Sequence, residues 1–141
     1  MTAQARQSTC VAVDGRGLLI EGPAGVGKSS LALALVDRGA RLVGDDSVML
    51  EAVEGALIAR PHPNTRGLME VRNLGLFAFP VLEEARVALV LRLDGNAPRH
   101  IEQADRLEIQ GVPLPCLALW PDGAVLALKA ELALARYGLN C

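Results

Sequence analysis

The stretch GPAGVGKSS (residues 22–30) restricts, more than any other part of the sequence, what this chain can fold into. It fits the pattern G-x-x-x-x-G-K-[ST], in which a glycine-rich loop joins a strand to a helix, at Gly22, Gly27, Lys28 and Ser29. The flanking sequence supplies both elements, because GLLIEG (17–22) is a short β-rich run and SSLALALVDRGA (29–40) has apolar residues at helical spacing. The loop therefore predicts an α/β domain that binds phosphate.

Each residue type in the loop suits a polyphosphate ligand. Glycines let the backbone approach phosphate closely, so that N–H groups point inward, and the helix that follows adds the positive end of its dipole. Lys28, one of two lysines in a chain with twelve arginines, supplies a point charge, and the Ser29 hydroxyl suits Mg²⁺. The alternative is a glycine-rich turn that binds nothing. We predict as nucleotide-binding residues Gly22, Pro23, Ala24, Gly25, Val26, Gly27, Lys28, Ser29 and Ser30.

The sequence on both sides of the loop is rich in predicted strands. STCVAV (8–13) and GLLIEG flank Asp14-Gly15, a dipeptide that favours a hairpin because both residues tolerate positive φ. RLVGDDSVMLEAV (41–53) predicts strand, turn and strand, and ALIAR (56–60) another short strand. ARVALVLRLD (85–94) is a near-continuous apolar run, typical of a strand in the centre of a sheet.

The remaining segments complete a single predicted domain over residues 1–141. PHPNTRG (61–67) predicts an irregular, mobile loop, while LMEVRNLGLFAF (68–79) has no clear assignment. LEIQGVPLPCLAL (107–119) predicts two short strands. Good helix formers from Ala124 to Tyr137, followed by a glycine, predict a closing helix.

Composition excludes several classes of function. A net charge of −2 without a block of Lys or Arg argues against nucleic-acid binding. The apolar runs are shorter than the ~20 residues of a membrane span, and no signal or transit sequence is apparent, so we expect a cytoplasmic protein. Three widely spaced cysteines predict ordinary reduced thiols, and His62 and His100 lack metal-ligand spacing.

Acidic and basic residues outside the loop are ambiguous when taken alone. Asp45 and Asp46 follow a predicted strand, and on an extended chain they would point to opposite sides, one to a metal and one to a reacting hydroxyl. The alternative is a solvated turn, since Gly-Asp-Asp-Ser is good turn composition. Glu70 and Arg72 share one face if LMEVR is a strand, where such pairs are more often surface ion pairs, and Arg106 is equally ambiguous.

The order of these segments resembles the catalytic domain of HPr kinase/phosphorylase. The similarity rests on GPAGVGKSSLALALVDRGARLVGDD, MEVRNLG, ADRL and the closing helix, and it covers about residues 7 to 138. It implies a P-loop kinase domain of the HPr kinase/PEP carboxykinase-like type, with a mixed β-sheet, a β-hairpin before the P-loop and flanking helices. Longer family members carry a further N-terminal domain, and this chain resembles the short form.

The resemblance also implies an activity. ATP would phosphorylate a serine of HPr, the phosphocarrier of the sugar phosphotransferase system, and inorganic phosphate would remove that group as pyrophosphate. Asp45 matches the family's catalytic carboxylate, Asp46 and Glu70 match acidic positions near the metal with Ser29, and Arg72 and Arg106 match arginines that grip a phosphoryl group. The implied cofactors are ATP and Mg²⁺, and the implied assembly is a homo-hexamer.

Three residues depart from the family pattern. Gln7 stands where the family has a histidine near its catalytic carboxylate, so any tuning of the Asp45 proton would be altered, and we expect kinase activity to survive better than phosphorylase activity. Ser30 stands where an acidic residue commonly follows the GKS segment in the family. Asn73 replaces a glycine, which predicts a changed backbone at that point.

Two other functions remain open from the sequence. The first is a P-loop kinase of the same fold with a different protein acceptor. The second is a non-catalytic ATP-binding regulatory module. The intact Asp45-Asp46 pair argues against the second. A GTPase ranks lower, because neither lysine lies in an N-K-x-D segment, which favours adenine as the base.

Overall fold

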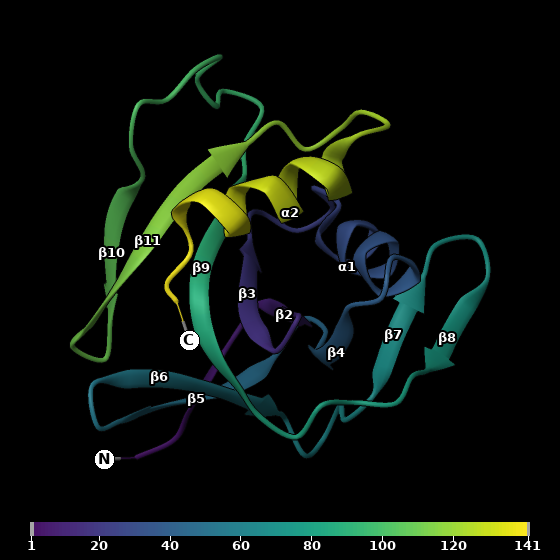
Figure 1. The fold of residues 1–141 in the computed structure, drawn as a ribbon. Helices are drawn as coiled ribbons and strands as arrows, with labels where there is room; N and C mark the ends of the chain where they lie inside the picture. Colours follow the sequence, from purple (N-terminus) through teal and green to yellow (C-terminus); the bar gives the residue numbers. More distant parts are fainter. Residues whose placement is uncertain (1, 141) are drawn as a thin grey trace.

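A computed structural model describes residues 2–140 of the chain (Figure 1). Two helices pack on a mixed, strongly curled sheet, and a separate two-stranded sheet lies beside them. The elements in chain order are β1 (Gln4–Arg6), β2 (Thr9–Val13), β3 (Arg16–Glu21), α1 (Lys28–Asp37), β4 (Arg41–Gly44), β5 (Val48–Val53), β6 (Ala56–Pro61), β7 (Leu68–Val71), β8 (Gly75–Ala78), β9 (Ala85–Leu93), β10 (Asp105–Ile109), β11 (Val112–Leu119) and α2 (Leu126–Tyr137).

Strand β9 lies at the centre of the main sheet, as its apolar sequence predicted. The strand order is β1-β5-β6-β9-β3-β2-β4. One edge of β9 runs parallel to β3, and the other pairs with β6 at Ala85 and Arg86 and then, in parallel, with β11 from Val90 to Leu93. Because β9 has neighbours along both edges and side chains packed on both faces, most of its residues are fully buried.

The predicted hairpin ahead of the glycine loop is confirmed. Strands β2 and β3 pair antiparallel, with Val13 opposite Arg16. Asp14 and Gly15 between them have φ values of 51° and 83°, the left-handed pair that a two-residue hairpin turn requires. The hairpin directs β3 to the centre of the sheet, so that the loop after Glu21 starts from a rigid support.

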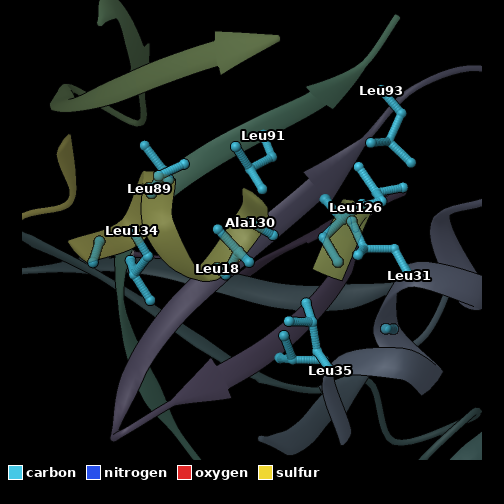
Figure 2. Close-up of a cluster of buried hydrophobic side chains, with 14 of the residues drawn as sticks. Leu18, Leu31, Leu35, Leu89, Leu91, Leu93, Leu126, Ala130 and Leu134 are labelled. Carbon is cyan, nitrogen blue, oxygen red and sulfur yellow. The ribbon is translucent and has the colours of Figure 1, made fainter. Parts of the chain in front are cut away.

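Both helices bury leucines against the same face of the sheet (Figure 2). Leu31 and Leu35 of α1 and Leu126 and Leu134 of α2 are at most 9% exposed. They pack on side chains from β3 and β9, namely Leu18, Leu89, Leu91 and Leu93. Complete burial of one such leucine contributes roughly 1.5–3 kcal/mol, so this layer holds the start of α1 firmly over the end of β3.

The opposite face of the sheet is closed by the sheet itself. Curling brings β5, β6 and the β10–β11 hairpin together over the far side of β2, β3 and β9. The second core cluster therefore contains no helical residue, and its largest fully buried side chains are Leu19, Leu50, Leu57 and Leu114. This double burial explains why β2, β3 and β9 read as continuous apolar runs.

Several boundaries differ from the predictions. The unassigned segment 68–79 contains the two-stranded sheet β7–β8, and the unpredicted strand β1 pairs with β5. Helix α2 begins at Leu126, two residues after Ala124, and Gly138 ends it with φ −70°. A Cβ at Gly138 would lie 2.5 Å from the Leu134 carbonyl oxygen, so close approach is what this glycine provides. No helix in the described part of the chain is long and apolar enough to span a bilayer.

Candidate functional site

The glycine loop has the backbone shape that its sequence predicts. Gly22, Gly25 and Gly27 all have positive φ, at 151°, 80° and 117°. At Gly22 a Cβ would lie 2.9 Å from Cγ1 of Val26 and 3.0 Å from the Leu93 carbonyl oxygen, so the space allows no side chain. Steric exclusion and positive φ together explain why glycine is needed at this turn.

The loop ends at a helix N-terminus that no side chain caps. Helix α1 begins at Lys28 with Gly27 as the N-cap residue, and its first turn contains no acidic residue. Its first N–H groups and the positive end of its dipole are therefore available to an anion. The Lys28 ammonium lies against the same loop, where it donates to the carbonyl oxygens of Gly22 (2.7 Å) and Pro23 (3.2 Å).

A cavity of about 250 Å³ opens in front of this helix terminus. Ten of its lining residues belong to the predicted site: Ala24, Gly25, Gly27, Lys28, Ser29, Ser30, Asp45, Asp46, Glu70 and Arg72. The apolar side of the cavity, which the sequence did not identify, consists of Leu33, Met69 and Val71. Four chain segments thus converge on one space: the loop, the start of α1, the turn after β4, and β7.

Asp45 is the most buried polar group of the cavity, with 8% of its surface exposed. Its Oδ1 atom accepts hydrogen bonds from the Ser29 hydroxyl (2.7 Å) and the Thr9 hydroxyl (3.0 Å). Thr9 lies on β2 and was not predicted as a site residue. A hydroxyl within the apolar run TCVAV is the signal that would have drawn attention to it.

The two aspartates lie in a turn, so the alternation predicted for an extended chain is not observed. Asp46 has φ 64°, and its N–H donates to the Thr9 hydroxyl at 3.2 Å. Asp45 is buried and Asp46 exposed, yet both line the same cavity. It is Asp45, and not Asp46, that contacts the Ser29 hydroxyl.

The hairpin β7–β8 brings the other charged groups to the loop. Glu70 on β7 and Arg72 just after it both line the cavity. The Arg72 Nη2 atom lies 3.7 Å from where a Cβ on Gly25 would be. The predicted backbone change at Asn73 is not seen, since its φ of 73° is the left-handed conformation of a glycine, which asparagine tolerates.

Several singled-out residues lie outside this cavity. Arg106 is exposed on β10, which Figure 1 shows on the opposite side of the fold from α1 and β7, so a single chain does not bring it to the loop. Gln7 is exposed just before β2. Gly22, Pro23 and Val26 line a second cavity behind the loop. Cys10 and Cys116 are free and buried, while Cys141 lies outside the described residues.

The donor set at the cavity fits Mg²⁺ held together with phosphate. Ser29, Asp46 and Glu70 offer a hydroxyl and two carboxylates, the hard oxygen ligands that Mg²⁺ prefers. Within residues 2–140 no cluster of three or more His, Cys, Asp or Glu side chains is placed to hold a metal ion unaided. Magnesium commonly binds through one or two carboxylates plus substrate phosphates, so the cavity suits a metal that arrives with a nucleotide.

An ion pair supports the strand that enters the loop. Arg6 donates from Nε and Nη2 to both carboxylate oxygens of Glu21, at 2.6 and 2.9 Å. Burial by itself raises the pKa of Glu21, but the hydrogen bond and charge of Arg6, with smaller contributions from Ser8 and Arg92, bring that pKa below its ordinary value of 4.5. The pair joins β1 to the last residue before Gly22.

Comparisons with known proteins agree with this geometry. The family model for the HPr serine kinase C-terminal domain matches residues 1–113. The HPr kinase/phosphorylase of Clostridium novyi (strain NT) is 39% identical over 146 residues, which cover 93% of this chain and 48% of that protein. That of Clostridium perfringens (strain SM101 / Type A) is 48% identical over 140 residues, covering 90% of this chain and 46% of that protein.

The fold is also similar to a solved structure. The Hpr(Ser) kinase/phosphatase from Coxiella burnetii superposes with a TM-score of 0.85 and 27% sequence identity, covering 94% of this chain and 88% of that chain. The chain spans about half the length of the curated relatives it matches.

Proposed function

The chain belongs to the HPr serine kinase C-terminal domain family, and on that basis we propose that it is a Mg-ATP-dependent protein serine kinase acting on an HPr-like phosphocarrier protein in the cytoplasm. The single observation that carries the proposal is the cavity at the start of α1. There an uncapped helix terminus, the Lys28 ammonium and the Asp45 carboxylate face one space. Phosphoryl transfer depends mainly on positioning and charge neutralisation, which this set supplies.

The loop, Ser29 and the charged residues of the cavity each have a role in the proposed reaction. The loop amides and Lys28 bind the outer phosphates, and Ser29, Asp46 and Glu70 hold Mg²⁺, which neutralises charge on the transferred group. Asp45 accepts the seryl proton, and Arg72 grips the phosphoryl group bidentately. In the reverse direction phosphate attacks phosphoserine to give pyrophosphate, and Asp45 returns its proton. Arg106 stays a candidate for a phosphoryl contact that requires another chain or a rearrangement.

The two lysines of the chain allow a matched test. We expect the purified protein to transfer radiolabelled phosphate from ATP to a serine of purified HPr, and Lys28→Met to abolish transfer. Lys129→Met removes the other lysine, which lies on α2 outside the cavity lining, with its ammonium 5.2 Å from the centroid of the Trp120 ring. This variant should transfer phosphate normally. Equal loss in both variants would argue against a phosphate-binding role of Lys28.

The alternatives predict different results in the same assay. A kinase with another acceptor would bind MgATP by calorimetry and ignore HPr, yet label a different protein. A regulatory ATP-binding module would bind MgATP and label nothing. The variant Asp45→Asn tests the catalytic role of Asp45. Unchanged phosphoryl transfer in this variant would show that Asp45 is not the general base.

We propose that the kinase direction is stronger than phosphorolysis. The support is the sequence: Gln7 stands where the family resemblance places a histidine, and glutamine cannot titrate. Adding phosphate to phospho-HPr should release pyrophosphate slowly, and Gln7→His should raise that rate relative to the kinase rate. Pyrophosphate release as fast as phosphorylation in the unmodified protein would contradict this.

We also propose that the chain forms a homo-oligomer, for which a hexamer is the expected order. Val125 (52% exposed), the residue that caps the start of α2, together with Leu128 (42%) and Leu132 (61%) on the helix, forms an exposed apolar stripe at helical spacing. Such a stripe is costly to leave in water and suits a subunit contact. Light scattering after size-exclusion chromatography should give a molar mass that is a multiple of the chain mass. Leu132→Glu should lower that molar mass toward the mass of one chain.

A further inference from the structure

Thr9 carries one of two adjacent buried hydroxyls, with Ser8, at the start of an apolar strand. It is 0% exposed on β2, where Cys10, Val11 and Ala12 follow it into the two hydrophobic clusters. A buried hydroxyl costs free energy unless it is hydrogen-bonded. Two groups of the Asp45-Asp46 turn satisfy the Thr9 hydroxyl: its Oγ1 donates to Asp45 and accepts from the Asp46 N–H.

The two carboxylate oxygens of Asp45 have different surroundings as a result. Oδ1 accepts both hydrogen bonds made by this side chain, from Ser29 and from Thr9. No buried side-chain oxygen in residues 2–140 lacks a partner, so Oδ2, which makes no hydrogen bond there, is the oxygen open to solvent. Two donors on one oxygen restrain the carboxylate, and because Asp45 lines the cavity, its other oxygen is the one left for a ligand there.

The same hydroxyl also holds the turn that carries both aspartates. Asp46 has a left-handed φ of 64°, a conformation that a non-glycine residue adopts at a cost and keeps only when its surroundings enforce it. The bond from the Asp46 N–H to Thr9 is such a restraint. Ser29 also donates to Asp45, but its hydroxyl makes no hydrogen bond to the Asp46 backbone or to β2 in the described part of the chain.

We propose that Thr9 is a positioning residue, whose hydroxyl anchors the Asp45-Asp46 turn to β2 and presents Asp45 Oδ2 to the acceptor serine. The inference rests on the proposed kinase function, because it assigns Asp45 the role of base. Thr9 touches neither substrate itself. Its effect is therefore on the rate of phosphoryl transfer and not on nucleotide affinity, which depends on the loop.

Three variants separate this role from simple packing. Thr9→Val keeps the shape and removes the hydroxyl, whereas Thr9→Ser keeps the hydroxyl and removes the methyl group. We expect Thr9→Val to lower kcat for HPr phosphorylation about 10–100-fold, the usual cost of losing an outer-shell partner, with KM for MgATP little changed. Thr9→Ser should restore most of kcat. Ser8→Ala, which removes the neighbouring buried hydroxyl bonded to the Ile20 carbonyl oxygen, should have little effect.

A spectroscopic measurement tests the geometry without any acceptor. The Asp46 amide should exchange slowly with solvent in the unmodified protein and in Thr9→Ser, and much faster in Thr9→Val. If Thr9→Val does not fold, Thr9→Ala carries the same expectation. An unprotected Asp46 amide in the unmodified protein would overturn the proposal, since that measurement needs no variant.

The outcomes also distinguish this proposal from the proposed function. A protein that never phosphorylates HPr but shows the predicted amide exchange would refute the kinase assignment and leave the anchoring of the turn supported. Active protein in which Thr9→Val keeps its full kcat would refute the positioning role and leave the kinase assignment intact. Loss of kcat in Thr9→Ser equal to that in Thr9→Val would show that packing matters and that the hydroxyl does not.

Discussion

Arg6→Met tests whether the ion pair at the entrance to the glycine loop stabilises the fold. Methionine keeps much of the length and apolar stem of arginine, so the variant chiefly removes the two charged hydrogen bonds to Glu21, of 2.6 and 2.9 Å. We expect the free energy of unfolding to fall at pH 7, because Glu21, with a side chain only 14% exposed, is left without its partner.

The magnitude lies between two known limits. Exposed pairs contribute at most about 1 kcal/mol, and truncating one partner of a fully buried pair costs about 3–5 kcal/mol. The Arg6 side chain is 35% exposed, so solvent screens part of its interaction with Glu21. A loss of about 1–2 kcal/mol follows for Arg6→Met.

The loss should depend on pH in a defined direction. The pKa of Glu21 is below its ordinary value of 4.5 in the folded protein, so its contribution to stability is present above pH 4.5 and disappears as pH falls through the folded pKa. Urea denaturation followed by circular dichroism should therefore show a smaller effect of Arg6→Met at pH 3 than at pH 7. A double-mutant cycle with Glu21→Gln isolates the pair energy.

A control and a clear refutation are available. Arg38→Met removes the pair with Glu131, in which Arg38 is more exposed, and should cost less stability than Arg6→Met. A coupling energy between Arg6 and Glu21 indistinguishable from zero at pH 7, or an equal loss at both pH values, would refute the reasoning.

Three further predictions concern the core, the loop and a thiol. Leu35→Ala removes a fully buried side chain of α1 and should cost about 2–5 kcal/mol in urea denaturation. Gly22→Ala should weaken MgATP binding roughly tenfold by calorimetry, because the new Cβ meets Val26 and the Leu93 carbonyl and the loop must shift. Burial raises the pKa of Cys10 to about 12, so iodoacetamide at pH 8 should label this residue only after unfolding, as peptide mass spectrometry can show; labelling of the native protein would contradict this.

The sequence predicted most of the elements near the loop because their causes are local. Asp14-Gly15 dictates a hairpin through its own backbone preferences, and apolar residues at helical spacing followed by Gly39 specify α1 and its end. The central position of β9 was also predictable, because burial on both faces leaves an unbroken apolar sequence. These signals need only neighbouring residues.

Prediction failed where the cause lies in distant contacts. In segment 68–79 only Met69 is fully buried, β8 is exposed throughout, and β7 packs beside α1, which lies far from it in the sequence. For Asp45-Asp46 the sequence left an extended pair and a turn both open, and nothing in its own residues reveals that Thr9, 36 residues earlier, holds the turn that forms. Arg106 matched a family motif, and its strand lies across the sheet from the cavity, so its phosphoryl contact stays a prediction that depends on more than one chain's own geometry.

The sequence by itself determined that this chain has a phosphate-binding loop between a strand and a helix, because glycine conformation, a lysine and helical spacing are properties of nine consecutive residues and their neighbours. Tertiary structure alone decided which polar groups meet that loop. Asp45, Glu70 and Arg72 reach the cavity because the sheet curls and β7 packs beside α1. Such long-range contacts depend on how buried surfaces fit together across the whole fold, and no short segment encodes them.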